Sequence, residues 1–255
     1  MPTTVRTLTE RQPSGSKNGS KTPTEPIGDN ARVRTKAVIF DFNGTISDDE
    51  PILDRLFREV FAADGIEFTT SYYYERLAGL SDPEIVERAL SDHDQPDDPE
   101  RAARLLRAKV DHYKVVVTQE PTVHESVAEF VRQVAARVPI AIASGALREE
   151  VDHVLEIAGI GPLFETVVCI DDVAHGKPEP DGYLLALAQL NAARTEPIAA
   201  GDALVFEDAD VGVASAHAAG MRCVAIENAA YSGRLAVAER MVTRLDPDCV
   251  DELLS

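Results

Sequence analysis

The chain has 255 residues, of which 44% are hydrophobic and 27% are charged, a composition typical of a globular protein that folds in water. Residues 1–36 carry seven Lys or Arg and three Asp or Glu, whereas the remainder carries 18 and 41, a net charge of −23. Such an acidic body would repel nucleic acids and anionic membranes, which we therefore exclude as partners. A phosphorylated substrate would need local positive charge at its site, which a divalent cation would supply.

The sequence shows no feature of a secreted or membrane-inserted protein. No apolar run approaches the roughly 20 residues that span a bilayer, and the N-terminus lacks the apolar stretch of a signal peptide. The three cysteines, Cys169, Cys223 and Cys249, lack the spacing of a metal site, and we interpret them as buried thiols in a reducing compartment. These features predict a cytoplasmic protein.

The N-terminal segment differs in composition from the rest of the chain. Residues 1–34 are rich in Ser, Thr, Pro, Gly and Lys and contain few apolar side chains. Such a segment cannot bury enough apolar surface to offset the entropy that ordering it would cost. We therefore predict that residues 1–34 form a disordered tail.

Beyond this segment, five short apolar runs alternate with longer stretches in which apolar residues recur at helical spacing. The runs are rich in Val, Ile and Ala and cover residues 36–41, 138–144, 166–171, 203–208 and 222–227. Near-continuous apolar runs of this length indicate strands that are buried on both faces, as in a parallel sheet. The alternation predicts the α/β fold class, with a doubly wound parallel sheet.

The spacing of these runs indicates an insertion. The later runs follow one another at intervals of about 20 to 35 residues, consistent with βαβ units, but nearly 100 residues separate the first run from the second. The extra segment is helical in pattern, so we predict a core of residues 35–50 and 122–255 with an α-helical cap at residues 51–121. A cap inserted there would lie over the carboxyl ends of the strands, where ligands bind in such folds.

Polar side chains stand at the ends of four of the apolar runs. They are Asp41, Ser144, the pair Asp171–Asp172 and the pair Glu207–Asp208. Each of them alone is explained as a strand end or a helix cap, but four together at one edge of a sheet predict a polar crevice. Lys177 follows the third run by a few residues and could reach this crevice.

Four segments match, in order, the four motifs of a known family. They are "DFNGT" (41–45), the Ser in "IASGA" (142–146), the Lys in "GKPEPDGY" (176–183) and the acidic pair in "VFEDADVG" (205–212). With them, residues 36–230 resemble the haloacid dehalogenase superfamily, whose core is Rossmann-like. The helical insertion and "DDEP" (48–51) resemble its subgroup with a small α-helical cap, which includes phosphoglycolate phosphatase-like enzymes and β-phosphoglucomutases.

The resemblance implies the chemistry of the site. Asp41 would be the nucleophile that takes the phosphoryl group as an aspartyl phosphate. Mg²⁺ would be held by Asp41, the backbone carbonyl of Asn43 and Asp208, with Glu207 close by, because this cation prefers hard oxygen ligands. Mg²⁺ and Lys177 would together offset the repulsion between the attacking carboxylate and the phosphate.

The same resemblance implies residues that bind the substrate. Ser144 and the amide of Gly145 resemble the pair that holds the phosphate, and Lys177 resembles the lysine that bridges phosphate and nucleophile. In the cap, "RLAGLSDPEI" (76–85) resembles the substrate-specificity loop of the family. Arg76 is therefore a candidate for contacting the substrate.

Asn43 departs from the family pattern. Phosphatases and phosphomutases of this family usually carry Asp at this position, where it protonates the leaving oxygen and then activates the attacking water or hydroxyl group. An amide cannot exchange a proton at neutral pH, and general acid–base help typically contributes ~10²–10⁴-fold to the rate. The replacement should therefore slow the reaction without abolishing the attack by Asp41.

Three hypotheses follow. The first is a Mg²⁺-dependent phosphatase of a small phosphorylated metabolite, in which Asn43 positions groups while water or another residue moves protons. The second is a different reaction on the same scaffold. A β-phosphoglucomutase-like phosphotransferase is disfavoured because its bound sugar phosphate must be protonated and deprotonated in turn. A phosphonate hydrolase would need a Schiff-base lysine, for which the cap offers only Lys109 and Lys114. The third is a weakly active or non-catalytic protein that binds a phosphometabolite. The oligomeric state is not determined by the sequence.

Overall fold

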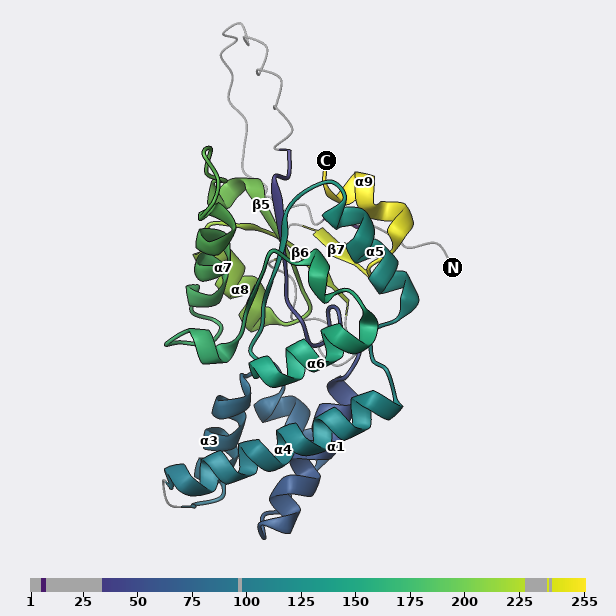
Figure 1. The fold of residues 1–255 in the computed structure, drawn as a ribbon. Coiled ribbons are helices and arrows are strands. Elements are labelled where there is room, and N and C mark those ends of the chain that lie inside the picture. Colours follow the sequence, from purple (N-terminus) through teal and green to yellow (C-terminus); the bar gives the residue numbers. More distant parts are fainter. Residues whose placement is uncertain (1–5, 8–33, 96–97, 228–237, 239) are drawn as a thin grey trace, which may run out of the picture.

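The computed structural model describes residues 6–7, 34–95, 98–227, 238 and 240–255, and these form an α/β fold (Figure 1). The sheet has the strand order β1-β7-β6-β5-β2-β3-β4, in which every neighbouring pair is parallel except β1 with β7. Its strands are β1 (Arg6–Thr7), β2 (Ala37–Phe40), β3 (Ile140–Ala143), β4 (Thr166–Val168), β5 (Ala203–Glu207), β6 (Arg222–Ile226) and β7 (Arg240–Val242). Strands β2 to β6 lie within the five predicted runs, so the predicted fold class is confirmed.

The strands send alternate side chains into two cores, one on each face of the sheet. Val38 and Phe40 of β2 lie in the core covered by α5, α6 and α9, whereas Ala37 and Ile39 pack beneath α7 and α8 (Figure 1). These helices are α5 (Glu125–Ala135), α6 (Arg148–Ala158), α7 (Asp181–Asn191), α8 (Asp210–Ala218) and α9 (Val250–Leu253). Short 3₁₀ turns are η2 (Gly161–Leu163), η3 (Ile170–Asp172), η4 (Ala200–Asp202) and η6 (Pro247–Cys249). Because both faces are covered, β2 (AVIF) and β3 (IAIA) are apolar at every position rather than at alternate ones.

Between β2 and β3 the chain forms a group of helices beyond the carboxyl end of β2 (Figure 1). The group contains α1 (Glu50–Ala63), α2 (Thr70–Tyr72), the π-helix η1 (Tyr73–Leu77), α3 (Asp82–Asp92) and α4 (Pro99–Gln119). Its buried apolar side chains, such as Phe57, Leu105 and Tyr113, belong to the same continuous core as Phe40. We propose residues 51–121 as the cap and residues 35–50 with 122–255 as the catalytic core.

Most of the expected N-terminal tail lies outside the described residues. Arg6 and Thr7 are an exception, because they form β1 and pair antiparallel with Met241 and Arg240 of β7. This short piece of the expected disordered tail is therefore a strand at the edge of the sheet. Two residues are too few for a periodic pattern, so this strand had no signal in the sequence.

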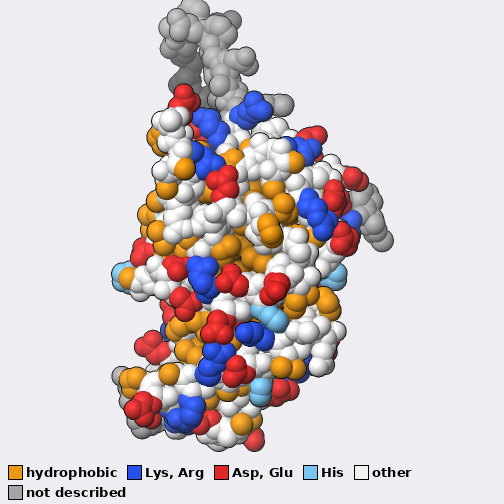
Figure 2. Space-filling model, viewed as in Figure 1, with side chains coloured by type: hydrophobic (Ala, Val, Ile, Leu, Met, Phe, Trp, Pro, Cys, Tyr) orange, Lys and Arg blue, Asp and Glu red, His pale blue; other side chains and the backbone are white. Residues whose placement is uncertain are grey.

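The described surface and the cysteines add little to the site. Acidic and basic side chains are intermixed over both the helical group and the sheet on the face shown in Figure 2.

All three cysteines are free thiols, with Cys169 and Cys223 buried and Cys249 half-buried. Within the described ranges, no helix combines the length and apolar character that crossing a bilayer requires.

Candidate active site

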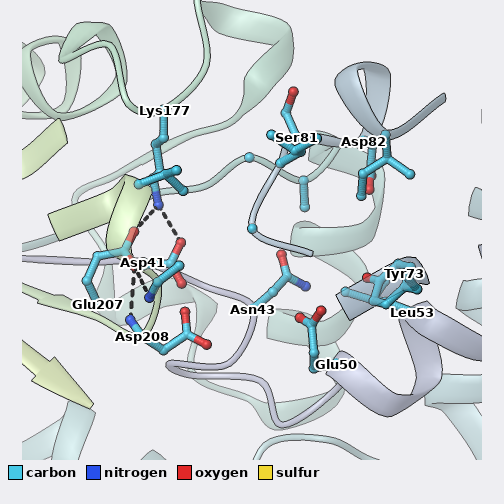
Figure 3. A pocket seen from close by; sticks show the side chains of 17 residues that line it. Asp41, Asn43, Glu50, Leu53, Tyr73, Ser81, Asp82, Lys177, Glu207 and Asp208 are labelled. Carbon is cyan, nitrogen blue, oxygen red and sulfur yellow. Dashed lines mark hydrogen bonds and ion pairs between the residues drawn. The ribbon is translucent and has the colours of Figure 1, made fainter. Parts of the chain in front are cut away.

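A cavity lies where the carboxyl ends of β2 and β5 meet the helices of the cap (Figure 3). Its volume is about 60 Å³, which is room for a phosphoryl group rather than for a drug-sized ligand. The core lines it with Asp41, Asn43, Gly145, Ala146, Lys177, Glu207, Asp208, Ala209 and Val211. The segment from α1 to α3 lines it with Glu50, Leu53, Tyr73, Gly79, Leu80, Ser81, Asp82 and Ile85. Six of the eight predicted site residues are thus brought together.

Asp41 directly follows β2 and is buried in this cavity. Its Oδ1 lies 2.5 Å from the Nζ of Lys177, and its Oδ2 is buried without a hydrogen-bond partner. The same lysine Nζ lies 2.5 Å from Oε1 of Glu207 at the end of β5. One ammonium group therefore bridges two carboxylates that neighbouring parallel strands carry at their ends.

Burial and neighbouring charges shift the pKa values of both Asp41 and Lys177. Burial, and then the charge of Glu207, raises the pKa of Asp41 to about 7 against the opposing charge of Lys177. Burial lowers the pKa of Lys177, but the charges of Asp41 and Glu207 outweigh this effect and hold the pKa above its usual value. The lysine is therefore a cation at neutral pH, and the carboxylates around it would be stabilised by a second cation.

Glu207 is a carboxylate whose two oxygens are fixed by hydrogen bonds. Its Oε1 accepts from Lys177 and, at 3.0 Å, from the hydroxyl of Tyr183. Its Oε2 accepts from the backbone amides of the next two residues, at 2.9 and 3.0 Å. Gly212 makes room for it, because a Cβ there would lie 1.7 Å from Oε1. Glu207 is thus placed to position Lys177, although the sequence suggested it as a metal ligand.

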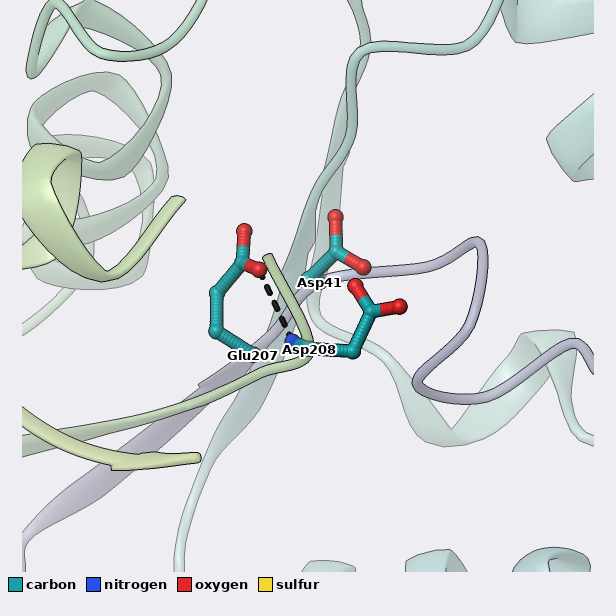
Figure 4. A group of neighbouring side chains, drawn as sticks. All are labelled: Asp41, Glu207 and Asp208. Atoms are coloured by element: carbon teal, nitrogen blue, oxygen red, sulfur yellow. Dashed lines mark hydrogen bonds between the residues drawn. The ribbon is translucent and has the colours of Figure 1, made fainter. Parts of the chain in front are cut away.

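Three carboxylates gather at the base of the cavity (Figure 4). Asp41, Glu207 and Asp208 each offer one oxygen, and these oxygens lie within 4.8 Å of one another. Asp208 occupies the space beside Gly44, where a Cβ would come within 1.9 Å of its Oδ2, and Gly44 has φ of +75°. Three hard oxygen donors this close together fit the Mg²⁺ ion that the family resemblance implies.

The loop after β3 borders the cavity through Gly145 and Ala146. The Oγ of Ser144 accepts a hydrogen bond from the amide of Ala146 at 3.0 Å, and Ser144 is not among the residues that line the cavity. The cap approaches this loop closely, because a Cβ on Gly145 would lie 3.3 Å from the Cα of Ser81. Ser81 is held by a capping box with Glu84 at the start of α3, which fixes the cap loop over the cavity.

The side chain of Asn43 is tied to a buried carboxylate. Its Nδ2 donates to Oδ2 of Asp49 at 2.9 Å, and the same oxygen accepts from Oγ of Ser47 at 2.8 Å and from the hydroxyl of Tyr113. Burial is the main cause that raises the pKa of Asp49 to about 6. An aspartate at position 43 would bring two carboxylates together, so the amide suits this network.

Two groups of predicted residues lie away from the cavity. The guanidinium of Arg76 pairs with Asp92 at 2.9 Å, and Arg76 is not among the residues that line the cavity. Asp171 and Asp172 lie in η3, after β4 at the edge of the sheet, and Asp172 pairs with Arg148. The prediction that this pair joins the crevice is therefore wrong.

Lys109, the first of the two cap lysines considered for a Schiff base, is fully buried in ion pairs. Its Nζ lies 2.9 Å from Oδ2 of Asp82 and 2.6 Å from Oε2 of Glu150. Burial lowers its pKa, but these two carboxylates outweigh that effect and hold the pKa above its usual value. A Schiff base forms from a neutral amine, so this arrangement does not suit a phosphonate hydrolase.

The sequence indicated part of the wall that the cap side contributes. Ser81, Asp82 and Ile85 belong to "RLAGLSDPEI" (76–85), which resembles the substrate-specificity loop, and Glu50 belongs to the "DDEP" segment. Leu53 and Tyr73 had no such signal, and they line the cavity because the helices of the cap fold over the edge of the sheet.

Comparisons with known proteins identify the family of the chain. A family model described as haloacid dehalogenase-like hydrolase matches residues 35–220. Protein CbbY of Rhodobacter capsulatus is 33% identical over 196 residues, which cover 74% of this chain and 84% of that protein. Fructose-1-phosphate phosphatase YqaB of Escherichia coli is 30% identical over 194 residues, covering 75% and 96%. A crystal structure of mutant CbbY from Rhodobacter sphaeroides with xylulose-(1,5)bisphosphate superposes with a TM-score of 0.74 at 26% identity, covering 83% and 95%. The chain therefore belongs to the haloacid dehalogenase-like hydrolases.

Proposed function

We propose that the chain is a Mg²⁺-dependent phosphomonoester hydrolase that acts on a small phosphorylated metabolite through an aspartyl phosphate at Asp41. The observation that carries this proposal is the setting of Asp41. One of its oxygens lies 2.5 Å from the ammonium of Lys177, and the other is partnerless in a cavity of phosphoryl size. A carboxylate presented in this way can attack phosphorus once its charge and that of the phosphate are offset.

The proposed metal ligands are Asp41, Asp208 and the backbone carbonyl of Asn43. Bound Mg²⁺ would supply the positive charge that lowers the repulsion between carboxylate and phosphate. Glu207 is the fourth residue of the predicted metal set, but its hydrogen bonds to Lys177, Tyr183 and two backbone amides support a positioning role instead.

The proposed reaction consists of two displacements at phosphorus. In the first, an oxygen of Asp41 forms a bond to phosphorus while the bond to the leaving oxygen breaks and that oxygen takes up a proton. In the second, water attacks the same phosphorus and loses a proton, the bond to Asp41 breaks, and inorganic phosphate leaves. Lys177 stays protonated throughout and stabilises the negative charge next to Asp41.

The names of several relatives support a phosphorylated sugar as the substrate. YqaB is named a fructose-1-phosphate phosphatase, and a Thermotoga maritima protein that is 29% identical over 189 residues is named a phosphorylated carbohydrates phosphatase. The cap side of the cavity combines apolar side chains, such as Leu53 and Ile85, with the polar Ser81. Such a mixed wall suits the carbon skeleton and hydroxyl groups of a small sugar.

The test is phosphate release from p-nitrophenyl phosphate and from a panel of sugar phosphates, with and without Mg²⁺. We expect release that requires Mg²⁺, is removed by EDTA and is lost in Asp41→Asn. The control is Asp171→Asn, an aspartate that also follows a strand but lies away from the cavity, and it should keep full activity. A thermal shift with sugar phosphates and no turnover of any of them would instead identify a binding protein.

A further inference from the structure

Glu50 is a carboxyl group of the cavity that the proposed mechanism does not yet use. It is the first residue of α1, and its side chain lines the same cavity as Asp41 and Asn43. Figure 3 shows its carboxylate directed toward Asn43. The residue is only 8% exposed, and its Oε1 has no hydrogen-bond partner. A buried carboxyl oxygen without a partner is costly unless something binds it, so its position facing the cavity calls for a ligand.

The other carboxyl groups that line the cavity in the described residues are already engaged. Asp41 and Asp208 serve as the proposed nucleophile and metal ligand, and Glu207 accepts four hydrogen bonds. Both oxygens of Asp82 lie within 3.0 Å of the ammonium of a buried lysine. Glu50 is the remaining acid in this set.

We infer that Glu50 donates and accepts the catalytic proton that Asn43 cannot carry, an inference that rests on the proposed function. In the first displacement, the protonated carboxyl group of Glu50 gives its proton to the leaving oxygen as the bond from that oxygen to phosphorus breaks. In the second, the resulting carboxylate takes a proton from the water that attacks the aspartyl phosphate. Glu50 is then protonated again, and the cycle is balanced.

The surroundings of Glu50 favour this exchange. Burial is the main cause that raises its pKa to about 7, and the charges of Asp49 and Asp41 raise it further. A hydrogen bond from Tyr73 and the charge of Lys109 act in the opposite direction. A carboxyl group with a pKa near the working pH is present in both its protonated and its ionised form. A group that serves first as an acid and then as a base needs both forms.

The test compares Glu50→Gln with the wild type on two leaving groups, in the presence of Mg²⁺. kcat/KM is measured for p-nitrophenyl phosphate and for the best-hydrolysed sugar phosphate of a panel, because it reports the steps up to the first displacement. A sugar alkoxide needs a proton to leave, so we expect a loss of about 10²-fold or more with the sugar phosphate. Nitrophenolate leaves without a proton, so the loss in kcat/KM for p-nitrophenyl phosphate should stay below about fivefold. The control Glu100→Gln removes an exposed glutamate in the first turn of α4 and should change neither value.

A second variant separates catalysis from structure. Asn43→Asp placed in the Glu50→Gln background puts a carboxyl group back beside the leaving oxygen, and we expect it to recover at least tenfold in kcat/KM for the sugar phosphate. Damage to the fold at position 50 would not be repaired in this way. An equal loss with both substrates, or no loss with the sugar phosphate, would overturn the inference while the proposed function stands. A wild type that hydrolyses neither substrate would overturn the proposed function itself, and this inference with it.

Discussion

The Oε1 atom of Glu207 lies 2.5 Å from the Nζ of Lys177, and this contact places the lysine against Asp41. Glu207 is itself fixed by the hydroxyl of Tyr183 and by two backbone amides. A carboxylate at the end of β5 therefore holds the cation that lies against the proposed nucleophile at the end of β2. These contacts support a positioning role for Glu207 rather than the predicted role as a metal ligand, and the two roles predict different behaviour.

Glu207→Gln should lower kcat while leaving the requirement for Mg²⁺ nearly unchanged. The amide can still accept a hydrogen bond, but Lys177 loses a charged partner, and a hydrogen bond to a charged group contributes about 1.5–3 kcal/mol, or roughly 10–100-fold. The measurement is kcat and the Mg²⁺ concentration for half-maximal activity. Asp208→Asn is the comparison, since it removes a proposed ligand and should raise that concentration. A large rise in Glu207→Gln would show that Glu207 binds the metal.

Gly44→Ala should remove activity because its side chain would collide with Asp208. The added Cβ would lie 1.9 Å from Oδ2 of Asp208, in a backbone with φ of +75°. Gly65→Ala is the matched control, because Gly65 has φ of +84° and nothing within 4 Å of its Cβ position. Both variants should lose about 1 kcal/mol of unfolding free energy from backbone strain. Phosphate release should fall at least tenfold in Gly44→Ala alone, and an equal effect in both would contradict the crowding at Asp208.

Lys109→Met should destabilise the fold far more than Lys114→Met, although both lysines belong to α4. Lys109 is buried between Asp82 and Glu150, and removal of one partner of a buried ion pair costs about 3–5 kcal/mol. Lys114 is 37% exposed and lies 3.6 Å from Glu149, so its loss should cost at most about 1 kcal/mol. Urea unfolding measures both values. Adding Glu150→Gln to Lys109→Met should recover part of the loss, because it replaces a buried carboxyl group that has lost its cationic partner.

The free energy of unfolding should fall as the pH rises from 5 to 8, in part because of Glu150. Burial, opposed by Lys109, raises the pKa of Glu150 from 4.5 to about 8. Between these values the folded chain keeps a proton that the unfolded chain releases, so raising the pH favours unfolding. Urea unfolding at pH 5 and pH 8 should show a decrease that is larger in the wild type than in Glu150→Gln, by on the order of 1–3 kcal/mol. The exposed neighbour variant Glu149→Gln should keep the wild-type decrease, and equal decreases in all three proteins would contradict the assignment.

The sheet and the chemical groups at its edge could be predicted from the sequence. Strands covered on both faces are mostly apolar, so β2 to β6 lie within short apolar runs. Parallel strands bring their carboxyl ends to one edge, which is why Asp41, Glu207 and Asp208 could be expected to meet. Lys177 joins them from the segment between β4 and α7, which reaches the same edge.

How these groups are used depends on the tertiary structure. The direction of a side chain is set by contacts between segments that are distant in the chain. The pairing of Asn43 with Asp49 and that of Arg76 with Asp92 therefore had no local signal. Leu53 and Tyr73 were missed for the same reason, since packing of the cap onto the sheet edge sets which of its side chains enclose the cavity.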